Sequence, residues 1–502
     1  MVEVNQTNKA RVMPKPVPFI IIYAFCERFC SIGIAAILVI FLNTKIGLSE
    51  DKSVAVLHYY YFAAYFFGIF GAIIADTFLG RFKTLFYGMS LLGGLGNVLL
   101  VIGTVAFLSY LMNSFTTIAL ILISFGAGCL EPNLPAYSGD QYRLPLEEKG
   151  FSLCIGLLFV MHNAARVLAM IIGPIVRSKT KCFGDDDCYP AVFGIFVVAK
   201  VCAILSILIG KRHAVIITPK DNMLVKVCGC IWFALKRKIS GPRQANKSHW
   251  LDYSVERYGA QIVSDTKRVV HVIALMPPLI IVATLYFQQV SRWVFQSRQM
   301  DGTLGNYQIK PDQVPLVNAI SVVIFVPLCE YVFNPLLSKF GIKSNLHRVI
   351  LGGFLSASAF IVAALVQFKV ENSEPKSLHM VWQVPQHMIL ALGEVLVYVQ
   401  ILQFAYTQAP AQMKSVLQAF FSMIIGGGNL IVALIASNKF FDSMAYEYLM
   451  FAGIVYAAMI VFTILALRYK YADVNDKTNN DFEMYESDDE GTALQNMHKN
   501  RK

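Results

Sequence analysis

Long apolar runs separated by short polar segments dominate this chain. Each run is about 20 residues long, which is the length of helix that crosses the hydrocarbon core of a bilayer. The runs lie near 18–43, 55–79, 84–108, 116–138, 150–173, 188–210, 269–290, 315–340, 348–368, 380–404, 413–436 and 444–467. The pattern therefore predicts an all-α membrane protein with 12 transmembrane helices.

The longest polar segment divides these twelve runs into two sets of six. Two six-helix bundles around a site near the membrane midplane are typical of the major facilitator fold. The predicted organisation is an N-terminal segment 1–17, a first bundle 18–210, a linker 211–268 with an amphipathic helix over 220–240, a second bundle 269–467 and an acidic, disordered tail 468–502.

Composition and charge agree with a lipid environment. The 502 residues are 56% hydrophobic and only 15% charged, whereas soluble domains are about 25% charged. The net charge of +11 comes from basic residues between the runs, so we expect no nucleic-acid partner. Basic loops mark the cytoplasmic side, which predicts a multi-pass integral membrane protein with both termini cytoplasmic and a plasma-membrane location.

Cysteine placement gives one structural hint. Cys182 and Cys188 flank a hydrophilic stretch, 183–187, and an extracellular loop would allow them to form a disulfide. Two free thiols are the alternative. The sequence shows no metal-ligand cluster, phosphate-binding loop or nucleophile motif, so we expect no enzymatic activity, metal or cofactor.

Ionisable residues inside the apolar runs are the main candidates for function. A charge at the centre of a membrane helix costs roughly 2.5–3.5 kcal/mol on insertion scales, so it must be paired or face a hydrated cavity. Glu27 and Arg28 lie inside the first run, as a structural ion pair or as a substrate or proton site. The other polar residues of this kind are Glu131, Asn163, Arg166, His271, Glu330 and Glu394.

Helical spacing places some of these side chains together. Asn163 and Arg166 are three residues apart and share one helix face, and so do His58 and Tyr65, which are seven apart. A purely structural role remains an alternative for His58.

The turn after the second run carries a further motif. In the stretch 71–83, Asp76 and Arg81 fit the spacing D-x-x-x-G-R-x-K of facilitator loops. We expect these two side chains to form a charge latch that stabilises one access state. An ordinary turn with basic residues on the cytoplasmic side is the alternative.

Three stretches resemble one transporter family. Ala24–Phe29 is similar to E-x-x-E-R-F, Phe125–Tyr142 to F-G-x-G-x-x-K-P followed by G-D-Q-F, and Phe404–Pro410 to F-x-Y-S-Q-A-P. On these residues the chain, from about 19 to 470, resembles the proton-dependent oligopeptide transporters. Only the short stretch 369–379 stands where mammalian members carry a large extracellular domain.

The resemblance implies a substrate pocket and a mechanism. It implies that Arg28, Tyr65, Asn163 and Asn318 contact the substrate and that Glu394 meets the amino terminus of a peptide. It further implies alternating access in a functional monomer within the lipid bilayer, with a di- or tripeptide as substrate and protons as co-substrate.

Several positions depart from the family pattern, and they suggest two hypotheses about coupling. The first acid of E-x-x-E-R is Ala24 and a lysine of the fourth run is Glu131, so we expect Arg166 to restore the charge balance by pairing with Glu131. A usual arginine–aspartate gate is His271 with Glu330, which predicts a titratable gate or a neutral hydrogen bond. The predicted coupling and gating residues are Glu27, His58, Glu131, Arg166, His271 and Glu330.

The sequence as a whole predicts a secondary active symporter that imports di- and tripeptides with protons. One alternative keeps the fold but carries another small solute, such as nitrate, an amino-acid derivative or a drug-like anion. A second alternative is a membrane sensor that does not transport.

Overall fold

The computed structural model describes residues 12–105, 110–143, 146–219, 222–240, 249–410, 413–438 and 440–471. Most of these residues are helical. The predicted N-terminal segment is described only from residue 12, and the predicted acidic tail lies outside the described residues from 472 onward.

The first half of the chain forms six spans. They are α1 (Val17–Thr44), α2 (Glu50–Ile74) continued by the π-helical turn η1 (Ala75–Leu79), α3 (Arg81–Thr84) with η2 (Leu85–Leu92) and α4 (Gly93–Thr104), α5 (Met112–Gly139), α6 (Glu148–Lys179) and α7 (Tyr189–Lys211).

A helical linker follows and leads into the second half. The linker holds α8 (Met223–Ser240), η4 (Trp250–Ser254) and α9 (Val255–Tyr258). The second half consists of α10 (Ala260–Ile273), α11 (Pro278–Tyr286), η5 (Gln288–Val290), α12 (Arg292–Arg298), the hairpin β1 (Thr303–Leu304) and β2 (Tyr307–Gln308), η6 (Pro311–Gln313), α13 (Leu316–Leu328), η7 (Cys329–Phe333), α14 (Asn334–Lys339), α15 (Asn345–Glu371), η8 (Met380–Gln383), α16 (Val384–Gln408), α17 (Lys414–Asn438) and α18 (Met444–Arg468).

The seventh span is broken. Eleven helices of the described chain are long and apolar enough to cross a membrane, and the helices Ala260–Ile273 and Pro278–Arg298 add a twelfth as a pair bent by 58°. Pro277 and Pro278 stand at the bend, where proline removes backbone donors and interrupts the helical hydrogen bonds. The protein is thus an all-α membrane protein with the twelve-span major facilitator fold, and its seventh span begins inside the segment assigned to the linker.

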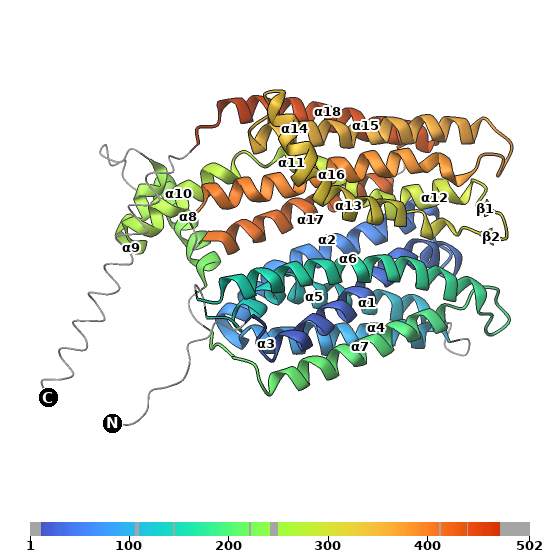
Figure 1. Ribbon diagram of the computed structural model, residues 1–502, viewed down its shortest axis with the longest axis horizontal. Helices are drawn as coiled ribbons and strands as arrows, with labels where there is room; N and C mark the ends of the chain where they lie inside the picture. Colours follow the sequence, from blue (N-terminus) through green and yellow to red (C-terminus); the bar gives the residue numbers. More distant parts are fainter. Residues whose placement is uncertain are drawn as a thin grey trace, which may run out of the picture.

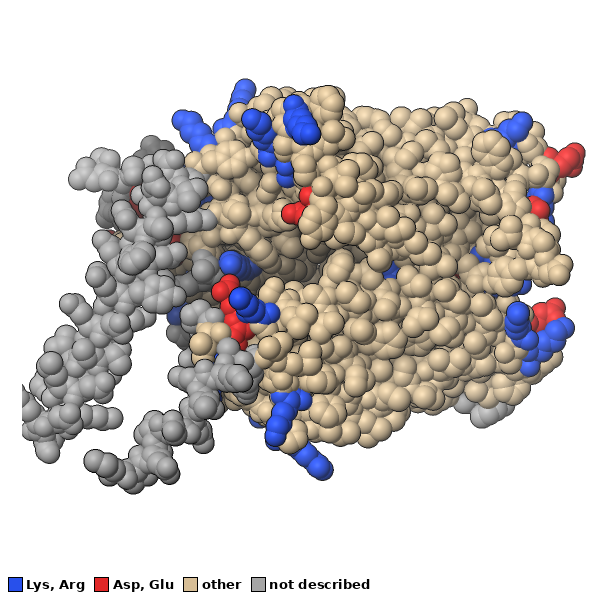
Figure 2. Space-filling view, in the orientation of Figure 1, with Lys and Arg blue, Asp and Glu red and all other residues tan. Residues whose placement is uncertain are grey.

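The two halves lie side by side, as Figure 1 shows, and α2 packs along α17 while α6 packs against α13. The linker helices, the start of α1 and the end of α18 lie at one end of the bundle, which we call the linker end; the β1–β2 hairpin lies at the other, which we call the hairpin end. On the face shown in Figure 2, charged side chains gather at these two ends and leave a broad uncharged band between them. Such a band is suited to contact with lipid.

Close helix packing depends on small residues. A Cβ atom at Gly128 of α5 would lie 2.6 Å from the backbone carbonyl carbon of Phe67 in α2. That distance is too short for any side chain, so glycine lets the two helices approach at this crossing.

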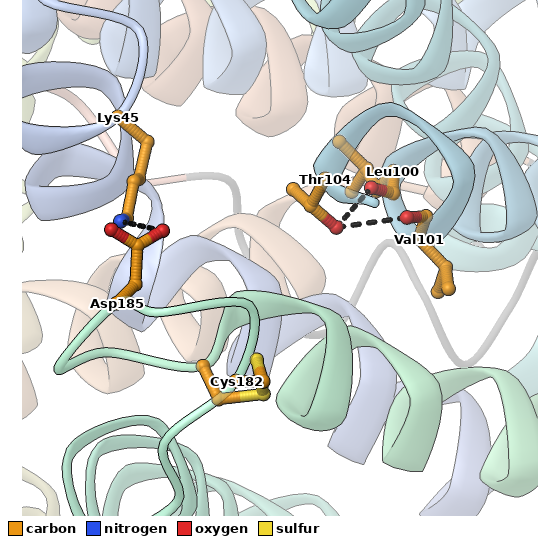
Figure 3. The surroundings of a disulfide bond; sticks show 7 residues. Lys45, Leu100, Val101, Thr104, Cys182 and Asp185 are labelled. Atoms are coloured by element: carbon orange, nitrogen blue, oxygen red, sulfur yellow. Dashed lines mark hydrogen bonds and ion pairs between the residues drawn. A yellow bond between two sulfur atoms is a disulfide. The ribbon is translucent and has the colours of Figure 1, made fainter. Parts of the chain in front are cut away.

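A disulfide closes the loop between α6 and α7 at the hairpin end. Cys182 and Cys188 are bonded, which decides between the two alternatives left open by the sequence. Figure 3 shows the loop beside the end of α1, where the Lys45 ammonium meets the Asp185 carboxylate at 2.6 Å. The disulfide-closed loop is therefore attached by an ion pair to the end of α1, which is remote from it in the sequence.

Candidate functional site

A cavity of about 410 Å³ lies between the two halves. Its walls come from α1, α2, α5 and α6 of the first half and from α11, α13, α16 and α17 of the second. Arg28 and Glu394 both line it, so two charges of opposite sign, one from each half, share one space. Figure 2 shows a hollow between the halves on the linker side.

Arg28 and Glu131 form a two-pronged ion pair on the cavity wall. The Arg28 guanidinium donates from both terminal nitrogens, with Nη2 at 2.9 Å from Oε2 of Glu131. The side chains are 17% and 36% exposed, respectively, so the carboxylate faces the cavity more than the guanidinium does. The predicted pairing of Glu131 with Arg166 is therefore wrong, because both oxygens of Glu131 bind Arg28 and Arg166 donates to Asn318 instead.

Glu27 belongs to a second pair that is sealed from the cavity. Lys200 of α7 donates from its ammonium to the Glu27 carboxylate, and both side chains are almost fully buried. Neither residue lines the cavity. The sequence reasoning missed Lys200, although a single lysine inside an apolar run is the same signal that identified Glu27.

Arg166 connects the two halves beside Glu394. Its Nη2 atom donates to Oδ1 of Asn318 at 2.9 Å, which joins α6 to α13. Asn318 is fully buried behind Arg166 and does not line the cavity. The Oε2 atom of Glu394 is buried without a hydrogen-bond partner, and the side chains of Arg166 and Asn318 are the groups that favour the charged form of this carboxylate.

These pairs balance the charge of the membrane interior. Three carboxylates and three cations contribute to it, and the formal charges cancel when the histidines are neutral. The six residues are Glu27, Glu131, Glu394, Arg28, Arg166 and Lys200. The prediction that Arg166 rebuilds this balance stays a prediction, because Glu131 pairs with Arg28 and the present count adds Glu394 and Lys200 to the four residues of the sequence count.

The remaining predicted contact residues, Tyr65 and Asn163, line the cavity. Tyr65 sits with its ring centroid 6.0 Å from that of Phe287. The Asn163 amide donates to the carbonyl of Phe159 in its own helix at 2.9 Å. His162 and Tyr398 also line the cavity and were not identified from the sequence.

His58 lies at a junction between the halves instead of facing the cavity. The imidazole is fully buried; its Nδ1 atom is 2.8 Å from Oδ1 of Asn429, and its Nε2 atom is 2.9 Å from Oγ of Ser291. Helix α2 is thereby tied to α17 and to the turn before α12.

Two ion-pair clusters close the hairpin end. In the first, Arg292 binds Asp51 at 2.6 Å and Glu447 at 2.9 Å. Asp51 and Glu447 stand in the first turns of α2 and α18, which begin with the capping side chains Ser49 and Ser443. An acid in a first turn is favoured by the helix dipole, so the local sequence places both carboxylates at this end.

The second cluster centres on Arg177 of α6. Its Nη1 atom donates to Asp187 of the disulfide-closed loop at 2.8 Å, and its Nη2 atom lies 3.1 Å from Asp312 of η6 in the other half. The Arg177 and Asp312 side chains are 6% and 0% exposed. Both clusters escaped the sequence analysis because nothing in the local sequence says which acid a distant arginine will meet.

The structure does not bring His271 and Glu330 together as a gate. The His271 ring is exposed and stacks on Tyr469 at 4.8 Å between centroids. Glu330 is exposed in the π-helical turn η7 and accepts a hydrogen bond from Asn334 at 3.4 Å. The prediction of a His271–Glu330 gate is wrong partly because of the break after α10, since His271 belongs to the short helix on the linker side of that break.

Arg81 joins two carboxylates in the turn after α2. Its Nε atom lies 3.6 Å from Asp76, and its Nη1 atom donates to Asp140 at the end of α5. The predicted ion pair of Asp76 and Arg81 is present and lies within the first half. Among the described residues, no group of three or more His, Cys, Asp or Glu is placed to hold a metal ion.

Comparisons with known proteins agree with this geometry. Residues 82–442 match the family model described as POT family. Peptide transporter family 1 of Drosophila melanogaster is 34% identical over 364 residues, which are 72% of this chain and 48% of that protein. Solute carrier family 15 member 2 of Mus musculus is 34% identical over 395 residues, which are 77% of this chain and 53% of that protein. The chain spans about half the length of these curated relatives.

Solved structures show the same fold. The crystal structure of an auto-inhibited POT family peptide transporter has a TM-score of 0.75 at 24% identity and covers 92% of this chain and 98% of its own. A second POT family transporter, crystallised in meso, has a TM-score of 0.77 at 21% identity and covers 90% of this chain and 98% of its own.

Proposed function

We propose, on the premise that this chain belongs to the POT family, that it imports di- and tripeptides together with protons by alternating access. The shared cavity between the halves carries the proposal. Arg28 and Glu394 line it from opposite halves, and a short peptide has a carboxylate at one end and an ammonium at the other. Opposite charges on two walls suit that zwitterion through charge-assisted hydrogen bonds.

The state of Glu394 supports its assignment to the peptide amino terminus. A buried carboxylate oxygen without a hydrogen-bond partner is costly, and a bound ammonium group would satisfy it.

The proposal assigns the linker end to the cytoplasm of a cell whose plasma membrane holds the protein as a monomer. Basic residues of the linker support this orientation. The disulfide of the opposite end supports it too, since disulfides persist in oxidising compartments. The ion-pair clusters at the hairpin end and the hollow on the linker side then correspond to an inward-facing state.

Uptake into proteoliposomes with an imposed proton gradient tests the proposal. Labelled dialanine should accumulate more than labelled alanine or nitrate, and the accumulation should collapse when a protonophore removes the gradient. Glu394→Gln should abolish most dialanine uptake, whereas Glu374→Gln, in an exposed loop at the hairpin end, is the matched control and should not. Equal uptake of dialanine with and without the gradient, or none at all, would reject the function.

A further inference from the structure

The guanidinium expected to receive the peptide carboxylate is already occupied. Glu131 binds Arg28 through both of its carboxylate oxygens, in the fork geometry by which arginine holds a free carboxylate. The occupant is also the more exposed of the two side chains in the cavity. A carboxylate that belongs to the protein therefore stands where the proposed function would place the carboxylate of the substrate.

The balance of charge determines whether Glu131 and a substrate carboxylate can both stay ionised beside Arg28. Arg28 and Glu131 together are neutral, and a second carboxylate beside Arg28 would leave one uncompensated negative charge in a low-dielectric cavity, which is costly. Protonation of Glu131 removes that charge. A protonated Glu131 also holds Arg28 less strongly, so the guanidinium becomes available to another carboxylate.

The surroundings of Glu131 offer few other ways to compensate the charge. Besides Arg28 of α1, the titratable groups that act on it are His162 of α6, Tyr65 of α2 and Tyr398 of α16. The two phenols carry no positive charge, and the imidazole lies near the cations Arg28 and Arg166, which disfavour a positive charge on it. Arg28 is thus the group on which Glu131 and a substrate carboxylate compete.

We propose that Glu131 is a tethered carboxylate that occupies the substrate-carboxylate site of the unloaded protein and takes up a proton when a peptide carboxylate binds Arg28. The inference rests on the proposed function and deepens it, because it assigns the coupled proton to one residue. Binding of the proton and binding of the peptide then favour each other by the same factor, as linkage requires.

Glu27 is the main alternative to Glu131 as the residue that takes up the coupled proton. It belongs to the family-like motif and is a buried carboxylate, but Lys200 seals it from the cavity on the side of α7. A peptide in the cavity cannot displace that pair by contact, so the structure places the competition at Glu131.

Calorimetric titration of the full chain in lipid nanodiscs tests the inference. Dialanine is titrated into wild type and Glu131→Gln at acidic and mildly alkaline pH, in buffers of different ionisation enthalpy, so that protons taken up per peptide are counted. Wild type should take up a proton and bind less tightly at the alkaline pH. Glu131→Gln should lose the proton uptake and bind about 10-fold more tightly than wild type at alkaline pH, within the range usual for coupled sites.

Dialanine amide, which lacks the carboxylate, provides a second readout that needs no variant. Wild type should bind it without proton uptake, even if Glu131→Gln fails to fold. Glu148→Gln, an exposed acid at the start of α6, is the control and should behave as wild type. Proton uptake that persists in Glu131→Gln, or that accompanies the amide, would overturn the inference. Wild type that binds dialanine at neither pH would instead contradict the proposed function.

Discussion

Neutralising Asp312 should loosen the closed hairpin end by an amount that the structure defines. Arg177 donates to both oxygens of Asp312, at 3.2 and 3.1 Å, across the boundary between the halves. In Asp312→Asn the side chain keeps its shape and loses its charge. Because Asp187 still binds Arg177, the cation is not left unpaired, and the cost is confined to the bond between the halves.

The size of the expected change in the free energy of opening follows from the burial of this hydrogen-bonded pair. A hydrogen bond to a charged group contributes about 1.5–3 kcal/mol, and the two side chains are 6% and 0% exposed, so little of it is screened in the closed state. Opening of the hairpin end separates and hydrates both groups, so the substitution leaves the free energy of the open state unchanged. At about 1.4 kcal/mol per factor of ten, opening should become about 10- to 150-fold more favourable.

Hydrogen–deuterium exchange of the full chain in nanodiscs measures this change. Amides of the loop 180–188 and of the start of α13 should exchange faster in Asp312→Asn by that factor, because exchange there requires opening. Asp186→Asn is the matched control: its partner Lys181 lies in the same loop, and the two side chains are 94% and 78% exposed. Exchange in Asp312→Asn that equals exchange in this control would refute the reasoning.

Three further changes test separate features of the structure. Lys200→Met should lower the free energy of unfolding by about 3–5 kcal/mol because Glu27 stays buried without its partner, and a thermal melt in detergent should show recovery when Glu27→Leu is added. Gly128→Ala should cost about 1–3 kcal/mol through overpacking of α5 on α2, whereas Gly156→Ala, with nothing within 4 Å of its added Cβ, should melt as wild type. Burial, with help from a neighbouring ammonium, lowers the pKa of His249. The linker should therefore lose stability as the pH falls below the unfolded-state value near 6.5, seen as faster proteolysis that His249→Gln makes independent of pH.

The architecture was predictable from the sequence because the membrane leaves few alternatives. Backbone groups in hydrocarbon must be satisfied within the segment, so each apolar run of sufficient length predicts a helix. The break in the seventh span is the main exception. Apolar residues continue across Pro277 and Pro278, so hydropathy gives no signal there, although the proline pair itself could have been interpreted as a break.

The candidate site was predictable as a set of residues but not as a set of partners. Glu27, Arg28, Glu131 and Glu394 were all identified, since a charge in an apolar run is visible in the sequence. Which cation pairs with which acid depends on the rotation and separation of the helices, and the sequence analysis left out Lys200, the partner of Glu27.

The disulfide at the hairpin end holds together the contacts that its loop makes with two helices. The loop closed by the disulfide includes Asp185, which pairs with Lys45, and Asp187, which pairs with Arg177, so we expect both ion pairs to weaken when the disulfide is reduced. A chain produced in a thiol-rich cell-free extract starts without this disulfide. Samples made that way need an oxidation step before their turnover is compared with that of protein matured in cells.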